Sequence, residues 1–147
     1  MKTIFDKTTK SELTRRINSI SEKNTAQWGK MNAYQMLKHC TLWEEMALGK
    51  TKYKQAFIGR LFGKMALRKV LGDDSPLAHS TPTVPAFRVT GSGDAEAQKA
   101  EWIRLIGEYD SFSNNNFIHP FFGKMTKEQI GQMAYKHADH HLRQFNA

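Results

Sequence analysis

The chain has 147 residues, of which 39% are hydrophobic and 24% are charged, and its formal net charge at pH 7 is +8. These values are typical of one folded domain and exclude wholesale disorder, and the lack of any apolar run of about eighteen residues excludes a membrane-spanning helix. The N-terminal segment is too polar for a signal peptide, and the single cysteine, Cys40, excludes an internal disulfide. We therefore expect a single domain, residues 1–147, in the cytoplasm.

Two helices are predicted before residue 50. The first begins at Thr9, where "TKSE" is typical of a capping box, and extends to about Asn24. The second begins at Asn32 with the capping box "NAYQ", and its apolar residues recur every three or four positions until Gly49 ends it. Because His39 lies beside this apolar stripe, we expect its side chain to point toward the interior.

A third helix is predicted over residues 53–72, and it contains most of a basic segment, residues 50–69. No acidic residue occurs between Glu45 and Asp73, whereas seven basic residues do: Lys50, Lys52, Lys54, Arg60, Lys64, Arg68 and Lys69. The apolar residues of this helix are Phe57, Ile58, Leu61, Phe62, Met65 and Val70. They are expected to cover the helical core while the basic residues are solvated.

Two other interpretations of the basic segment stay open. It can attract an anionic thiol or substrate to a nearby site, or it can lie on an acidic membrane or a nucleic acid. Specific nucleic-acid binding is not expected, because the aromatic residues share the apolar stripe and no recognised reader motif is present.

The second half of the chain is predicted to hold an extended connection and two more helices. Residues 73–93 contain three of the four prolines, and their strand candidate, "TVPAFRVT", is itself interrupted by proline. The fourth helix begins near Asp94 and the fifth at Thr126, where "TKEQ" is another capping box. The predicted fold class is all-α, most simply a four-helix bundle with one additional basic helix and a long crossover connection.

Three histidines are the candidate metal ligands. His137 and His141 are four residues apart on the inward stripe of the last helix, so their Cβ atoms should be about 5–6 Å apart. His39 is the candidate third donor. Three neutral imidazoles with an open fourth position are typical of a catalytic zinc site, and nickel, iron or manganese would also fit. The alternative is a pair of surface or hydrogen-bonded histidines that bind no metal.

Other residues are candidates for the surroundings of this site. Trp43, His119, His140 and Gln144 are candidates for a pocket or for hydrogen bonds to the ligands, with Arg143, Asp139 and Glu44 as further candidates for the latter role. Cys40 is expected to be a core residue, because its side chain diverges from that of His39 by about 100°.

The sequence resembles the DinB-like superfamily, in one of its branches of unknown function. The resemblance rests on "WGKMNAYQMLKHC" and "HPFFGKMTKEQIGQMAYKHADHHLRQF", and the middle segment "STPTVPAF" also fits. The resemblance implies a four-helix bundle that holds a divalent metal, here through His39, His137 and His141.

The superfamily also implies a range of activities. Its characterised members include metal-dependent transferases and isomerases that use low-molecular-weight thiols, and hydrolases, so we expect a metal-dependent enzyme with a small-molecule substrate. Zn²⁺ and Ni²⁺ are the first candidates for the metal. The alternatives are a non-catalytic protein that binds a metal or small ligand, and a stress-associated protein. The oligomeric state stays open, with a homodimer as one option.

Overall fold

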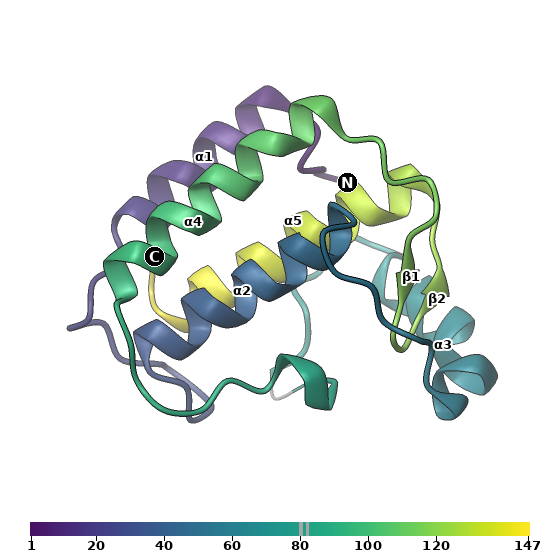
Figure 1. Cartoon of the computed structure of the whole chain (residues 1–147). Coiled ribbons are helices and arrows are strands. Elements are labelled where there is room, and N and C mark those ends of the chain that lie inside the picture. The colour runs from purple at the N-terminus through teal and green to yellow at the C-terminus, as the bar shows by residue number, and fades with distance from the viewer. Residues whose placement is uncertain (80, 82) are drawn as a thin grey trace.

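The computed structural model describes residues 1–79, 81 and 83–147, so Ser80 and Pro82 of the predicted connection lie outside the described part (Figure 1). In that part the chain forms five α-helices and one short two-stranded sheet. The helices are α1 (Lys7–Asn18), α2 (Ala33–Ala47), α3 (Phe57–Val70), α4 (Ala95–Gly107) and α5 (Lys127–Gln144). The predicted all-α class is confirmed. None of the helices in these ranges combines the length and apolar content that crossing a membrane requires.

Four of the helices enclose the hydrophobic core. α1 packs against α4 and α5, and α2 packs against the same two helices, so that α1 lies beside α4 and α2 lies beside α5 in Figure 1. Each helix contributes fully buried apolar side chains, among them Leu13, Ile17, Met36, Leu37, Trp102, Ile106, Leu142 and Phe145. Burial of these side chains is the main stabilising term for the arrangement.

The predicted helix starts are confirmed for three helices. Asn32 and Thr126 form complete capping boxes with Gln35 and Gln129, and the Asp94 side chain accepts from the backbone N–H of Ala97. The prediction for α1 is wrong. This helix begins at Lys7 and ends at Asn18, and Thr9 lies inside it with a buried side chain, because the chain enters α1 from Ile4, which is bonded to Gly131 of α5.

A small hairpin that the sequence analysis missed precedes α5. Its strands β1 (Ile118–His119) and β2 (Gly123–Lys124) are antiparallel, and Nδ1 of His119 accepts the backbone N–H groups of Phe121 and Phe122 in the turn. Strands of two residues carry no alternating pattern, so periodicity could not find them. The strand candidate "TVPAFRVT" instead contains a 3₁₀ turn, η1 (Pro85–Phe87).

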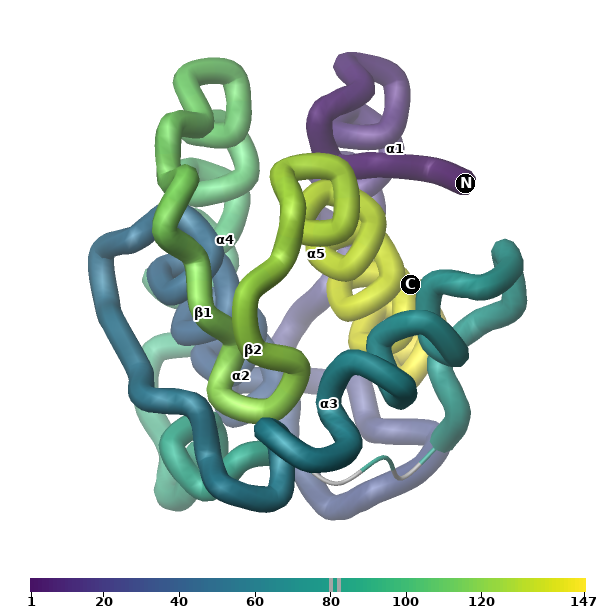
Figure 2. Tube along the Cα trace, turned by 90° about the vertical axis from the view of Figure 1, so that its right-hand side faces the viewer, coloured from purple at the N-terminus to yellow at the C-terminus, as the bar shows by residue number. Residues whose placement is uncertain are grey.

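α3 lies outside the four-helix core and packs on the hairpin (Figure 2). Its buried positions are Gly59, Gly63 and Leu67, and a Cβ atom at either glycine would come within 2.3 Å of the carbonyl oxygen of Phe121. The expectation that the apolar stripe of α3 covers the core is therefore wrong. Close backbone contact at the two glycines turns the small side of the helix inward and the large apolar side chains outward.

Candidate metal centre

Two helices bring the three candidate histidines together. His39 lies in the middle of α2, and His137 and His141 lie one turn apart on α5. Because the capping boxes at Asn32 and Thr126 determine where each helix starts, they also set the phase in which these imidazoles face the interior. All three side chains are buried, with exposed fractions of 4–8%.

The three imidazoles converge on one point. Nε2 of His39 lies 3.0 Å from Nε2 of His137, and each of the three residues offers a ring nitrogen within 4.8 Å of the other two. Nitrogens that share an ion at the usual Zn–N distance of about 2.0–2.1 Å lie about 2.9–3.4 Å apart. The donor set and the separation of the His39 and His137 nitrogens therefore fit a shared divalent metal ion, with a nitrogen of His141 within 4.8 Å of both.

Hydrogen bonds orient two of the rings. Nδ1 of His39 donates to the carbonyl oxygen of Phe87 at 2.9 Å, and Nδ1 of His141 donates to Oε1 of Gln144 at 2.9 Å. Since both partners are acceptors, the hydrogen bonds assign the proton of each neutral ring to Nδ1 and leave the Nε2 lone pair free. Gln144 is itself held, because its amide nitrogen donates to the carbonyl of Trp28 at 2.8 Å.

The ring of His137 differs from the other two in its hydrogen bonds. Nδ1 of His137 is buried and has no hydrogen-bond partner among the described residues. If Nε2 of His137 donates to His39, Nδ1 is an acceptor without a donor, and if Nε2 binds a metal, Nδ1 carries a hydrogen without an acceptor. Either state leaves one polar atom unsatisfied, so the cluster is not a self-contained hydrogen-bonded core.

Burial keeps the three imidazoles neutral. Loss of solvation lowers the pKa of His39 and lowers the pKa values of His137 and His141 well below the ordinary value. The neighbouring imidazoles lower the pKa of His137 further. Because only a neutral imidazole can donate a lone pair to a metal, the site is in its ligating form at neutral pH.

The four pocket candidates lie at different places around this cluster. Trp43 stacks on His137 with ring centroids 5.4 Å apart, and Gln144 is the partner of His141 described above. His140 packs its edge against Trp28 and His141. His119 lies in the hairpin, 6.4 Å from Trp43 between centroids, with Nδ1 used by the turn.

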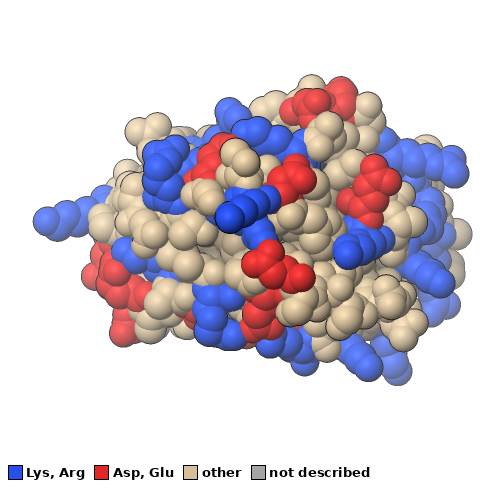
Figure 3. Space-filling model, turned by 90° about the horizontal axis from the view of Figure 1, so that it is seen from above, with Lys and Arg blue, Asp and Glu red and all other residues tan. Residues whose placement is uncertain are grey.

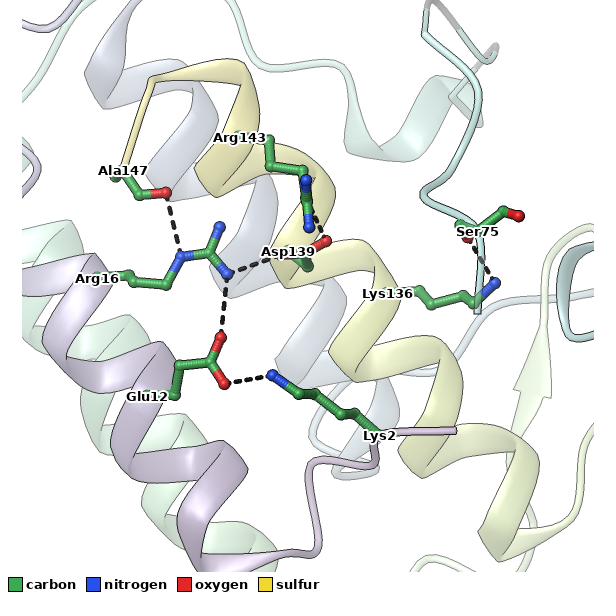
Figure 4. A network of polar contacts seen from close by, with 8 residues as sticks. All are labelled: Lys2, Glu12, Arg16, Ser75, Lys136, Asp139, Arg143 and Ala147. Atoms are coloured by element: carbon green, nitrogen blue, oxygen red, sulfur yellow. Dashed lines mark hydrogen bonds and ion pairs between the residues drawn. The ribbon is translucent and has the colours of Figure 1, made fainter. Parts of the chain in front are cut away.

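Among the described residues, no hydrogen bond or ion pair joins the three further candidates to the imidazole cluster. The Glu44 carboxylate accepts from Trp102 Nε1 and the Tyr109 hydroxyl between α2 and α4. Asp139 bonds Arg16 of α1 and Arg143, each at 2.7 Å (Figure 4). The Arg16–Asp139 ion pair therefore joins α1 to α5, on the side of α5 opposite His137 and His141. Cys40 is fully buried beside Met36, as expected of a core residue.

Two residues that matter to the site were missed. Phe87 contributes its backbone carbonyl, which every residue possesses, so its side chain gave no sign of this role. Trp28 holds Gln144 in the same way and adds its ring to the neighbourhood of His140. The proline at the first position of η1 was the available signal, since it favours a tight turn at Phe87 rather than a strand.

Comparison with known proteins identifies a family for this chain but no individual relative. No match was found among curated proteins or among solved structures. The model of one family, described as a protein of unknown function (DUF1569), matches residues 4–147, which includes all three histidines and every helix of the fold. The chain therefore belongs to the DUF1569 family.

Proposed function

We propose that this protein holds a divalent metal ion, Zn²⁺ or Ni²⁺ as first candidates, through His39, His137 and His141, and uses it to act on a small molecule. The observation that carries the proposal is the convergence of three buried neutral imidazoles, two of them with the proton on Nδ1 and a lone pair on Nε2. Three protein ligands leave a coordination position for a further ligand, which is typical of catalytic rather than structural zinc sites.

We further propose that the four core helices form a four-helix bundle of the DinB-like type. Support comes from the contacts of α1 and α2 with both α4 and α5, and from the placement of one proposed ligand on α2 and two on the last helix. The resemblance noted in the sequence implies the same distribution of ligands. α3 and the connection that carries η1 would then be additions to the bundle.

The leading reaction classes are transfer involving a low-molecular-weight thiol and hydrolysis. A bound divalent ion supplies positive charge that lowers the pKa of a nearby thiol or water molecule. The residues of the chain orient the imidazoles through Phe87 and Gln144, while the Trp43 ring covers His137 and excludes water from that side. Thiol chemistry also agrees with the reducing compartment that a single cysteine predicts.

The second candidate is a non-catalytic protein that binds a metal or small ligand. The low exposure of the three side chains, 4–8%, favours this alternative, because a substrate needs access to the ion. A chelator-sensitive turnover assay with several low-molecular-weight thiols, electrophiles and esters separates the two. Turnover that disappears on chelation supports the enzyme, and metal binding without turnover across the panel supports the alternative.

Metal stoichiometry of protein purified without an affinity tag tests the site itself. We expect about one equivalent of divalent metal in the native chain and the loss of most of it in His39→Ala, His137→Ala and His141→Ala. His140→Gln is the matched control, because His140 is the immediate neighbour of His141 and is not one of the three ligands. Full occupancy in a helical His141→Ala variant would contradict the proposed ligand set.

A further inference from the structure

The outward face of α3 carries most of the exposed apolar surface. Seven large apolar side chains are exposed in the described part of the chain, and five of them lie on this helix: Phe57, Ile58, Leu61, Phe62 and Met65. Their exposed fractions range from 47% to 74%. A cluster of this kind on one helix is a typical sign of an interaction surface, whereas single exposed apolar residues are not.

This exposure follows from how α3 is attached. Residues four apart lie in rows along a helix, and the row of Gly59, Gly63 and Leu67 is the one that is buried. The backbone N–H of Ala56 and the side chain of Gln55 also bond carbonyls of the hairpin. The helix is therefore docked by its small side, and its apolar rows face away from the protein in a defined orientation.

A basic flank borders the apolar face. Arg60, Lys64 and Arg68 form the next row of α3, and all three are exposed. Lys64 and Arg68 also line an open hollow of about 630 Å³ together with Lys124 and Lys127. No ion pair among the described residues involves any of these five side chains. In Figure 3 Lys and Arg side chains gather along the right-hand edge, the side on which α3 lies in Figure 1.

We propose that this face docks the protein on an anionic lipid bilayer. The helix has 14 residues and would lie along the surface over about 21 Å. Its apolar rows would enter the boundary between headgroups and acyl chains, and the basic flank would contact lipid phosphates. An apolar face bordered by lysine and arginine is the pattern of helices that lie in the membrane interface.

The basic flank and the apolar rows together favour a lipid bilayer over two other possible partners, a second copy of this chain and a nucleic acid. A second copy that paired through the same face would bring two basic flanks together with no acidic residue of α3 to compensate them. Nucleic acid would satisfy the positive charges but would leave Ile58, Leu61 and Met65 in water. A bilayer with anionic headgroups satisfies both the apolar rows and the flank.

Vesicle binding by the full untagged chain tests the proposal. Flotation is measured with phosphatidylcholine vesicles and with vesicles that also contain about 30 mol% phosphatidylglycerol, at low and at high salt. The apolar variant combines Phe57→Gln, Leu61→Gln and Met65→Gln, and the basic variant combines Arg60→Gln, Lys64→Gln and Arg68→Gln.

The matched control removes three charges elsewhere. It combines Lys7→Gln, Arg15→Gln and Lys23→Gln. These three residues lie on or just after α1, are exposed and form no ion pair in the described structure. The control lowers the net charge by the same amount as the basic variant. Circular dichroism checks that all the variants keep their helix content.

We expect salt-sensitive binding to the anionic vesicles and much weaker binding to the neutral ones. Each Lys or Arg near an anionic surface contributes about fivefold in affinity, so the basic variant should lose about a hundredfold. The apolar variant should lose binding, while the control should keep it within about tenfold. No flotation by the native chain, equal binding to neutral vesicles, or an equal loss in the control would overturn the proposal. A dimer that only the apolar variant disrupts, without vesicle binding, would assign the face to a second copy.

Discussion

The candidate metal centre and the outward face of α3 depart from ordinary burial in opposite directions. At the centre, three polar imidazoles are buried among apolar side chains, and on α3, five large apolar side chains face solvent. Each departure costs free energy in the isolated chain, since the imidazoles lose solvation and the apolar side chains stay hydrated. The buried imidazoles of the first region suit a cation, and the apolar and basic side chains of α3 suit an apolar, anionic surface.

The largest loss of stability is expected when the ion pair between Arg16 of α1 and Asp139 of α5 is removed. Arg16 and Asp139 have side chains only 11% and 8% exposed, so Arg16→Met leaves a poorly solvated carboxylate and should lower the free energy of unfolding by about 3 kcal/mol. Arg143→Met removes the other partner of Asp139, but Arg143 is 54% exposed and should cost less than about 1 kcal/mol. Urea unfolding measures both variants, and equal effects would contradict the assignment.

Titration of the buried Glu44 carboxyl should change the free energy of unfolding with pH, by about as much as Arg16→Met changes it. Burial raises its pKa from 4.5 to about 7, so the folded chain binds the proton more tightly than the unfolded chain does. The contribution of Glu44 to stability therefore falls as the pH rises from about 4.5 to about 7, by about 3 kcal/mol in total.

Glu44→Gln removes this titration while keeping the shape of the side chain. The difference in unfolding free energy between native and variant chains, measured in urea at several pH values, should change over that window and be constant above it. A difference in unfolding free energy that is independent of pH would show that burial does not raise the pKa of Glu44.

Loss of the Gln144 acceptor should weaken the metal site without removing a ligand. Gln144→Leu leaves Nδ1–H of His141 without its partner, and such losses lower metal affinity about 10- to 100-fold. Gln132→Leu is the control, because Gln132 lies on the same helix and its side chain bonds Glu128, outside the imidazole cluster. Competition with a chelating dye gives both affinities. An unchanged affinity in Gln144→Leu would mean that His141 needs no orienting partner.

The smallest expected effects have opposite signs and concern two helical glycines, Gly63 at the attachment of α3 and Gly107 in α4. At Gly63 a Cβ atom would lie 2.2 Å from the carbonyl oxygen of Phe121, so Gly63→Ala should cost about 1–3 kcal/mol despite its better helix propensity. At Gly107 of α4 nothing lies within 4 Å of such an atom, and Gly107→Ala should gain up to about 1 kcal/mol. Hydrogen exchange of α3 should quicken only in the Gly63 variant, and metal affinity should be unchanged in the Gly107 variant.

The elements with explicit local signals could be predicted from the sequence. The capping boxes of α2 and α5 each place two hydrogen-bonding side chains three residues apart, and the structure confirms both boxes and the predicted start of α4 near Asp94. The four-residue spacing of His137 and His141 predicted a shared face, and the structure brings His39 to the same point. Periodicity and capping act within a few residues, which is why these features are visible in the sequence.

The remaining features depend on contacts between distant segments. Nothing in "TKSE" reveals that Thr9 is needed inside the core, and nothing near His39 reveals that the carbonyl of Phe87 orients it. The outward turn of α3 depends on the hairpin backbone at Phe121, which only the assembled structure brings against Gly59 and Gly63. An apolar stripe predicts that a helix is amphipathic, but not which of its sides meets the protein.

One buried lysine joins the two regions that the predictions separate. The ammonium group of Lys136, the residue before His137, donates to the carbonyl oxygens of Val70, Asp73 and Ser75 at 2.7–2.9 Å. Figure 4 shows the bond to Ser75. Val70 is the last residue of α3, and Asp73 and Ser75 lie in the segment that follows it, so the three N–H groups of one side chain fasten the end of that helix and its exit segment to α5. A tilt of α3 displaces these oxygens, and the turn of α5 that presents His137 must follow them or give up three bonds at once.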